Sequence, residues 1–397
     1  MAPTAQRRKY WNGYKSGCLV LTLALAAAVS TAQTSVTVQT DSKGTSAFDK
    51  LWDFPVLYKN DLNPFIEEFD FTGRLQLDYF TVDSDKGSTD FFEIRRFRLG
   101  VDSWFAERHL ELKATVDTAL RNYHAPSVFY NRMTDLFLNV HVSDALNIRS
   151  GKFEPHFGYD REFSDIQQKF FERGILDDQV FNNTGNDYVA GASVLGKLDN
   201  WGYQAAVFSD NVGKEYGTFD GGVSVLLEVS YDFSEAMTAD KALWAVDYMN
   251  MQNTPNANVF NTLHNAAATY FDFQKRRFCA VAQIGYGNGT TEKGDVYQLM
   301  IMPSYYVIPN RLEAVVRYQH ANADHSNGIA LMNRQVKTVG SFTGNAYDSV
   351  YLGLDYYLYG QKCKLMLGEQ FDDLRGGTGS NAGFQGWTTL LGFRMYW

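Results

Sequence analysis

The sequence predicts an all-β fold, namely a sixteen-stranded antiparallel transmembrane β-barrel with short periplasmic turns and longer extracellular loops. Three observations carry this prediction. Apolar and polar residues alternate along most of the chain, the connections between the alternating segments are short and long in turn, and the last segment, Trp387 to Trp397, is aromatic to its end. Successive residues of a strand face opposite sides of a sheet, so this alternation gives each strand one apolar face.

The first residues have the build of a secretory signal peptide. A basic stretch, "RRKYWNGYK", precedes an apolar core of 11 residues, "LVLTLALAAAV", and Ser30 and Ala32 precede an expected cleavage after Ala32. This core is too short to span a bilayer as a helix. We expect residues 1–32 to be a cleaved signal peptide, residues 33–68 a short periplasmic segment, and residues 69–397 the barrel.

Composition excludes several classes of protein. Removal of residues 1–32 leaves 32 basic and 45 acidic residues, a formal charge of −13, so we expect no nucleic acid partner. The rest of the chain has no apolar run near the ~20 residues that a membrane helix needs. Cys279 and Cys363 lie on different segments without metal-like spacing. We expect them to be unpaired, and we expect no metal or cofactor.

Period-two alternation is clear in "FDFTGRLQLDY", and it recurs in "HLELKATVD", "TDLFLNVHV", "VSVLLEVSYD" and "RLEAVVRYQ". Most of the alternating segments reach the ~9 to 11 residues that a tilted membrane strand requires. In chain order the expected strands are 69–82, 91–105, 109–118, 134–142, 146–153, 187–196, 201–210, 223–232, 242–250, 260–272, 277–287, 295–306, 311–320, 347–359, 362–370 and 387–397.

The connections between these strands fall into two sets. The short ones are "AER" after Phe105, "SDA", "KLDN", "SEAMTADK", "QKRR", "IPN" and "GQ". The longer ones lie near 83–90, 119–133, 154–186, 211–222, 251–259, 288–294, 321–346 and 371–386. Sixteen antiparallel strands with both ends on one side need seven turns and eight loops, the arrangement of a bacterial outer-membrane barrel.

The aromatic end of the chain fits a strand that closes such a barrel. Pairing of the last strand with the first leaves no edge, so every backbone group finds a partner within lipid. We expect the apolar outer face to contact outer-membrane lipid. The segment that ends at Trp397 also resembles the signal that the barrel-assembly machinery recognises.

An interior formed by sixteen strands is too wide for wall side chains to fill, so the prediction includes a water-filled channel. Its selectivity would then depend on charges in the lumen and on a loop folded inward. The longest loop, 154–186, contains "REFSDIQQKFFERGILDDQVFNN", with Lys169 and Arg173 among its bases. We expect this loop to fold into the pore; the alternative is an external loop that caps the barrel.

The strand "FFEIRRFRLGVDSWF" concentrates positive charge. Alternation places Arg96 and Arg98 in the lumen, whereas Arg95 breaks the pattern. Because a charge facing mid-bilayer lipid costs about 2 to 4 kcal/mol in a barrel, we expect Arg95 near an interface or beside a β-bulge. Arg96 and Arg98 would contact solutes, pair with neighbouring lumen acids, or do both; the candidate acids are Asp78, Asp102 and Asp117.

At these residues the chain resembles a known family. "RRFRLG", "LELKATVD", "LNIRSGKFEPHFG" and "FFERG" follow one another in an order that resembles the phosphate-selective porin O and P family of Gram-negative outer membranes. The resemblance implies a sixteen-stranded barrel, usually a homotrimer, whose third loop narrows the pore and whose lumen arginines and lysines select anions. Carried over by motif, it points to Arg95, Arg96 and Lys152.

The charge pattern departs from what strict phosphate selectivity requires. Lumen positions carry bases at Arg74, Arg96, Arg98, Lys113, Arg149, Arg277, Arg317, Lys364 and Arg394, and acids at Asp70, Asp78, Asp102, Glu111, Asp117, Asp135, Glu228, Asp232, Asp247 and Glu313. Because these charges nearly balance, two hypotheses stay open: a passive pore for small hydrophilic solutes, and a pore for inorganic anions such as phosphate.

A barrel enzyme that hydrolyses lipid is the alternative of a different class. The chain has no Gly-x-Ser-x-Gly nucleophile elbow, so we expect no enzymatic activity. The candidate pore-lining and solute-binding residues are Arg95, Arg96, Arg98, Lys113, Arg149, Lys152, Lys169 and Arg173.

Overall fold

The computed structural model describes residues 52–119, 129–181, 187–213, 215–252, 254–260, 263–289 and 294–397. The expected signal peptide, 1–32, and the first part of segment 33–68 lie outside these residues. In the described part of segment 33–68, β1 (Val56–Lys59) pairs with β2. Within the same part of the chain, no helix combines the length and the apolar character needed to cross a membrane.

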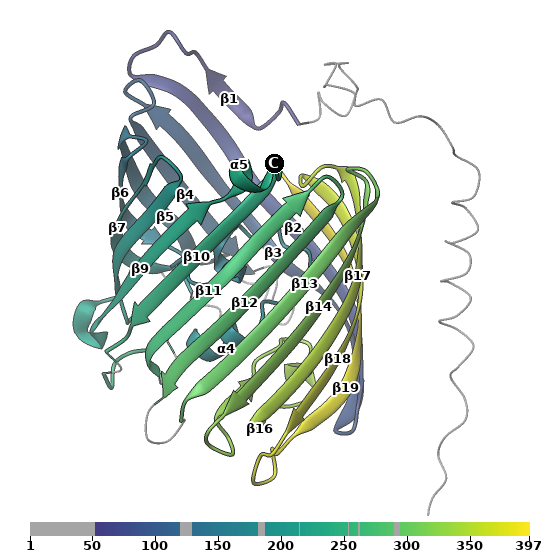
Figure 1. The fold of residues 1–397 in the computed structure, drawn as a ribbon. Coiled ribbons are helices and arrows are strands. Elements are labelled where there is room, and N and C mark those ends of the chain that lie inside the picture. The colour runs from purple at the N-terminus through teal and green to yellow at the C-terminus, as the bar shows by residue number, and fades with distance from the viewer. Residues whose placement is uncertain are drawn as a thin grey trace, which may run out of the picture. The chain divides into compact units, whose positions relative to one another are not determined.

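Sixteen strands of the described chain form one closed antiparallel wall (Figure 1). They are β2 (Ile66–Ser84), β3 (Gly87–Phe105), β4 (Leu110–Thr118), β5 (Tyr130–Ser143), β6 (Leu146–Phe153), β7 (Val189–Leu198), β8 (Trp201–Ser209), β9 (Val223–Asp232), β10 (Lys241–Asn250), β11 (Leu263–Lys275), β12 (Phe278–Gly289), β13 (Val296–Ile308), β14 (Leu312–Ala323), β17 (Ala346–Tyr359), β18 (Cys363–Arg375) and β19 (Phe384–Tyr396). The predicted fold class is confirmed, and the predicted strands agree with these to within a few residues.

The wall closes where β19 pairs with β2. At the end of this seam, Trp397 and Gly73 exchange two backbone hydrogen bonds, each with an N to O distance of 3.0 Å. A glycine is needed at position 73, because a Cβ there would lie 2.2 Å from the indole ring of Trp397. The aromatic end therefore belongs to the closing strand, as the sequence predicts.

The two faces of the wall differ in the way that alternation requires. Gln283, Gln298 and Gln319 on one face are almost fully buried, whereas Ile284 and Leu391 on the other are 61% and 52% exposed. The polar face is the inner one, since its side chains contact residues of the loops that pack there. A mean hydropathy of −0.30 follows, because only alternate residues face lipid.

The short connections lie where the sequence predicts them. Asp199, Arg276, Asn310 and Gly360 each have φ between 50° and 57°, the left-handed backbone of tight turns. The longest of the seven short connections, "SEAMTADK", contains α5 (Ser234–Met237). Figure 1 shows this helix at the same end of the barrel as the chain's carboxyl terminus.

One predicted loop is wrong. Instead of a long loop near 83–90, β2 and β3 continue to a two-residue turn at Asp85 and Lys86, flanked by the paired residues Ser84 and Gly87. The two strands have 19 residues each and extend beyond the length that a membrane requires. Gly87, with φ 137°, provides a backbone conformation that other residues rarely adopt.

Two loops at the opposite end have structure of their own. The third loop (residues 154–188, of which 182–186 are not described) contains α3 (Tyr159–Glu162) and α4 (Ile175–Val180). The seventh loop (residues 324–345) contains β15 (Ile329–Leu331), β16 (Phe342–Gly344) and a 3₁₀ turn, Val336–Thr338. Helix α4 contacts β12, β13 and β15, so the two loops pack on each other and on the wall.

The largest apolar core of the described chain lies between these loops and the wall. Phe170, Phe171 and Ile175 of the third loop are buried in one cluster with Met300 and Tyr351 of the wall. Burial of such side chains favours a fixed position of the loop by about 1.5 to 3 kcal/mol each. Cys279 and Cys363 are both buried and unpaired, as expected.

Candidate functional site

The two adjacent arginines of β3 are accommodated by a β-bulge. In the pairing of β2 with β3, Gln76 lies opposite Arg96, but Leu77 lies opposite Ile94, so Arg95 is an extra residue. The bulge turns Arg95 as well as Arg96 toward the polar face, away from lipid. Of the two positions expected for Arg95, near an interface or beside a β-bulge, the structure shows the bulge.

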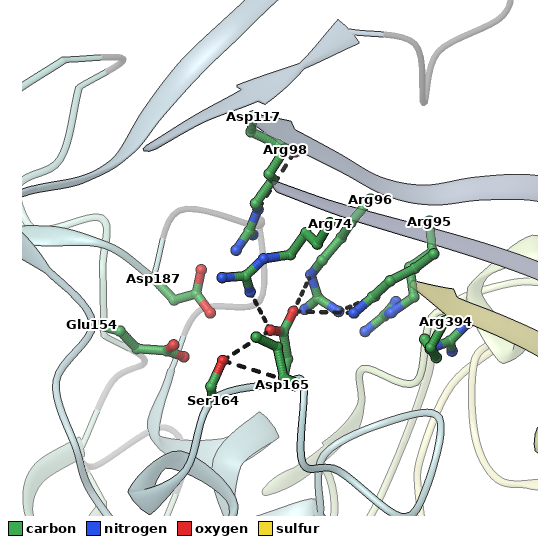
Figure 2. A network of polar contacts seen from close by, with 12 residues as sticks. Arg74, Arg95, Arg96, Arg98, Asp117, Glu154, Ser164, Asp165, Asp187 and Arg394 are labelled. Carbon is green, nitrogen blue, oxygen red and sulfur yellow. Dashed lines mark hydrogen bonds and ion pairs between the residues drawn. The ribbon is translucent and has the colours of Figure 1, made fainter. Parts of the chain in front are cut away.

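Both arginines bind acids of the third loop. Arg95 Nη1 lies 2.9 Å from Glu172 Oε1, and Arg96 Nε lies 3.1 Å from Asp165 Oδ2. Asp165 also forms an ion pair with Arg74 of β2, and it lies among the guanidinium groups in Figure 2. One loop carboxylate therefore joins two arginines from neighbouring strands.

Gln76 of β2 forms hydrogen bonds to both Arg96 and Asp165 of this cluster. Its side-chain oxygen accepts a hydrogen bond of 2.9 Å from Arg96 Nη1, and its amide nitrogen donates to Asp165 Oδ2 at 3.3 Å and to the hydroxyl of Tyr396 at 2.9 Å. Only 1% of Gln76 is exposed. A buried, fully engaged amide of this kind fixes the guanidinium plane of Arg96.

Charge determines the protonation state of Asp165. Burial alone would raise the pKa of this carboxyl, but the nearby guanidinium groups of Arg74, Arg96 and Arg98 outweigh burial and hold the pKa well below its ordinary value. Asp165 is therefore ionised at any pH near neutrality.

Two further groups of ion pairs lie beside this cluster. Arg98 Nη1 donates to the hydroxyl of Tyr188 at 2.7 Å, and its Nε lies 3.6 Å from Asp117. Arg173 of the third loop lies 2.5 Å from Glu154 and 3.0 Å from Asp187. Arg161 contacts the same two acids at 2.7 and 3.2 Å.

The third loop also contacts strands that are far from its own flanking strands, β6 and β7, in the order of the sheet. Lys169 Nζ lies 2.6 Å from Glu313 of β14 and donates to the hydroxyl of Ser304 of β13 at 3.1 Å. Lys364 of β18 donates to the carbonyl oxygen of Gln168 at 2.6 Å. The loop is thus attached to β2 and β3 through Asp165, and to β13, β14 and β18 around Lys169.

Arg334 was missed by sequence reasoning. This residue of the seventh loop places its Nη2 2.9 Å from Glu172 Oε1 and 3.0 Å from Asp78 Oδ2, and it also forms an ion pair with Glu93. A lone arginine in a loop of more than twenty residues carries no signal of where it will lie. Its position depends on packing of the seventh loop that the sequence pattern does not encode.

Lys113, Arg149 and Lys152 lie outside these clusters. Lys113 is opposite Asp102 in the pairing of β3 with β4. Arg149 lies over the ring of Phe137, with 4.6 Å from its guanidinium carbon to the ring centroid. Lys152 donates to the carbonyl oxygen of Gly213 at 3.1 Å. Lys113 and Arg149 line a cavity of about 230 Å³ that Arg74 and Asp165 also line.

The acids expected to pair with Arg96 and Arg98 were identified correctly in part. Asp117 contacts Arg98, as expected. Asp78 binds Arg394, at 2.5 Å, and Arg334 instead. Asp102 lies opposite Lys113 and forms no ion pair among the described residues. The partner of Arg96 is Asp165, a loop residue, and the alternation of residues along a strand cannot predict such a partner.

The closed barrel and its charged, polar interior define an outer-membrane channel of the porin class. The sequence profile of the family "Phosphate-selective porin O and P" matches residues 69–270, more than half of the chain. The chain belongs to this family, and it is a passive channel of the outer membrane. No curated relative matches it.

Solved structures of outer-membrane proteins share the fold. The channel DcaP of Acinetobacter baumannii is 12% identical, with a TM-score of 0.57 over 86% of this chain and 99% of that one. An anion-selective porin from Comamonas acidovorans is 11% identical, with a TM-score of 0.57 over 83% and 99%. OmpT of Vibrio cholerae, in a trimer form, is 16% identical, with a TM-score of 0.51 over 83% and 99%.

Proposed function

We propose that this porin is a general diffusion channel for small hydrophilic solutes and ions, without strong preference for phosphate, and that its third loop forms the constriction. One observation carries the proposal: the arginines of β2 and β3 that contact the third loop, and Arg173 within that loop, are matched by carboxylates. Arg74 and Arg96 share Asp165, Arg95 binds Glu172, and Arg173 binds Glu154 and Asp187.

Paired charges limit the selectivity of a pore. Opposite charges about 3 Å apart cancel each other's field within a few ångströms in water, so a passing ion meets a dipole rather than a net positive potential. Such a lumen stays hydrated and polar, which suits neutral hydrophilic solutes and ions of both signs. Strong anion preference would require bases in excess along the narrowest section.

The rival reading is an anion-preferring pore. Lys113 and Arg149 favour it, because neither forms an ion pair among the described residues, and so does the anion selectivity of the Comamonas porin. In this reading the eight candidate residues, from Arg95 to Arg173, would contact the permeating anion directly.

The zero-current potential in a KCl gradient across a planar bilayer distinguishes the two. We expect the wild type to give a potential close to zero, and Arg96→Ala with Arg98→Ala to move it toward cation preference only slightly. A wild type with strong anion preference that falls in the double variant would contradict the proposal and support the phosphate-type pore. Detergent-dependent hydrolysis of phospholipid by the purified protein would instead support a barrel enzyme.

We also propose that the porin is a homotrimer, which family membership and the trimer form of OmpT support. Lipid would cover the rest of the apolar outer face, and the barrel-assembly machinery would recognise the segment ending at Trp397. Native mass spectrometry in mild detergents tests the assembly, and monomers in all of them would contradict it. Slower assembly of a Trp397→Ala variant in cells, but not in detergent refolding, is expected if the terminal segment is recognised.

A further inference from the structure

Asp165 is held in the way that proteins hold a bound oxyanion. Its Oδ1 faces the guanidinium of Arg74, and its Oδ2 lies 3.1 Å from Nε of Arg96 and 3.3 Å from the amide nitrogen of Gln76. Each oxygen thus has its own charged donor, and one has a neutral donor in addition. Charge-assisted hydrogen bonds from two guanidinium groups are the usual means of binding phosphate or carboxylate.

The donors belong to the barrel wall, on β2 and β3. Arg74 lies opposite Arg98, and Gln76 opposite Arg96; the two pairs are two residues apart along the β2 and β3 ladder and share one face. Gln76 holds Arg96 at 2.9 Å and is itself held by Tyr396 of β19. The wall therefore provides the three donors, Arg74, Arg96 and Gln76, which together form an oxyanion cradle, and the third loop provides the anion.

Asp165 is the sole acid that neutralises this cradle in the described part of the chain. Neither Arg74 nor Arg96 forms an ion pair with any other acid there, whereas Arg98 has Asp117. Loss of the Asp165 carboxylate would leave two guanidinium groups without a counter-charge, and these are strong sites for an anion from solution.

The cradle is accessible to such an anion. The cavity of about 230 Å³ that borders Arg74 and Asp165 is lined by the bases Lys113 and Arg149 and also by the acids Glu111, Asp135 and Glu154. Because charges of both signs line it, the cavity gives a small ion access to the cradle without favouring either sign.

We propose that Asp165 is a built-in counter-ion that occupies an oxyanion site made by Arg74, Arg96 and Gln76, and that it thereby sets the ion preference of the pore. The site itself would take a small oxyanion such as inorganic phosphate. This inference deepens the proposed function, because it assigns the lack of strong anion preference to one carboxylate.

Two substitutions separate the charge of Asp165 from its volume. Asp165→Asn removes the charge and keeps the shape, so it tests ion preference. Asp165→Ala also empties the position, so it tests whether inorganic phosphate enters. Glu162→Gln and Glu162→Ala are matched controls, because Glu162 lies in the same loop, lines the same cavity and forms no ion pair among the described residues.

We expect the ratio of chloride to potassium permeability to rise about tenfold in Asp165→Asn and less than about twofold in Glu162→Gln. Phosphate added to a chloride solution should block the current of Asp165→Ala at a concentration about tenfold below that needed for the wild type or Glu162→Ala. Equal behaviour of the Asp165 and Glu162 variants would overturn the inference.

The outcomes also separate this inference from the proposed function. A wild type that is already strongly anion-selective contradicts the proposed general pore, whereas the role of Asp165 depends on the difference between the Asp165 and Glu162 variants. A heat-modifiable band on unheated gels shows that each variant is folded. If Asp165→Ala does not fold, the shape-preserving Asp165→Asn still decides the question.

Discussion

Arg334 links the seventh loop to the third loop and to the wall, so its removal should loosen the seventh loop. The guanidinium lies 2.9 Å from Glu172 and 3.0 Å from Asp78, and it contacts Glu93. In Arg334→Ala these three carboxylates stay close together, and within the described part of the chain only Arg95 and Arg394 remain to pair with any of them. Like charges would then repel where an attraction existed.

The size of the effect follows from burial. A fully buried pair that loses one partner costs about 3 to 5 kcal/mol, and an exposed pair about 0.2 to 1 kcal/mol. The side chain of Arg334 is 18% exposed, and those of its three partners are 11% or less. We therefore expect a loss of about 2 kcal/mol, which raises the population of the opened seventh loop about 30-fold.

Cleavage by a lysine-specific endoproteinase measures this opening in the folded, detergent-solubilised protein. Lys337 lies in the 3₁₀ turn of the seventh loop, and its backbone nitrogen donates to the carbonyl oxygen of Asn333 at 3.0 Å, so cleavage there requires local opening. When opening is faster than cleavage, the cleavage rate follows the opened population. Arg334→Ala should therefore raise the cleavage rate at Lys337 about 30-fold.

Arg375→Ala is the matched control, because Arg375 pairs with Asp348 and Asp373 while its side chain is 54% exposed. Exposed pairs contribute little, so the cleavage rate at Lys337 should change less than about fivefold. A cleavage rate in Arg334→Ala that equals the wild-type rate would refute the reasoning, since it would mean that apolar packing and the remaining hydrogen bonds hold the seventh loop without this ion pair.

Two further predictions concern closure and pH. Gly73→Ala should reduce the yield of folded, heat-modifiable barrel in detergent refolding, because overpacking at the Trp397 contact costs about 1 to 3 kcal/mol. Addition of Trp397→Leu to the same chain should restore part of the yield. A yield that is not restored would argue against this contact as the cause. Burial, together with Arg149, Arg161 and Arg173, lowers the pKa of His156 from 6.5 to about 4, so protonation favours the unfolded chain. The free energy of unfolding in urea should therefore fall as the pH drops from 6.5 toward 4, and fall less in His156→Gln; parallel pH profiles would contradict this role.

The strands could be predicted because each depends on local pattern. Alternation gives one apolar face, and β6 and β9 lie where it predicts them, from Leu146 to Phe153 and from Val223 to Asp232. Even the bulge at Arg95 follows from a local rule, since a charge cannot face lipid without cost. The error at 83–90 has the same origin: past the membrane the outer face becomes polar, so the pattern fades although the β2 and β3 ladder continues to Ser84 and Gly87.

The partners in the candidate site could not be predicted, because they are separated by long stretches of chain. Asp165 is 91 residues from Arg74, and Glu172 is 162 residues from Arg334. Alternation along a strand predicts which face of the sheet a side chain lies on, but it does not predict which loop side chain contacts it on that face. Alternation thus placed Arg96 and Arg98 on the inner face and suggested wall acids as their partners, whereas the third loop provides the acid that binds Arg96.

This division between wall and loop explains why overall charge says little about selectivity. The cradle of Arg74, Arg96 and Gln76 belongs to β2 and β3, beside the seam where β19 pairs with β2, so changing it would disturb strands that close the wall. Asp165 belongs to a loop, and loops tolerate substitution more readily than strands do. A single loop residue can therefore move the pore between neutral and anion-preferring states while the wall stays the same. If so, two members of this family with the same paired arginines need not share a solute, and the residue that faces those arginines from the third loop is the one to compare.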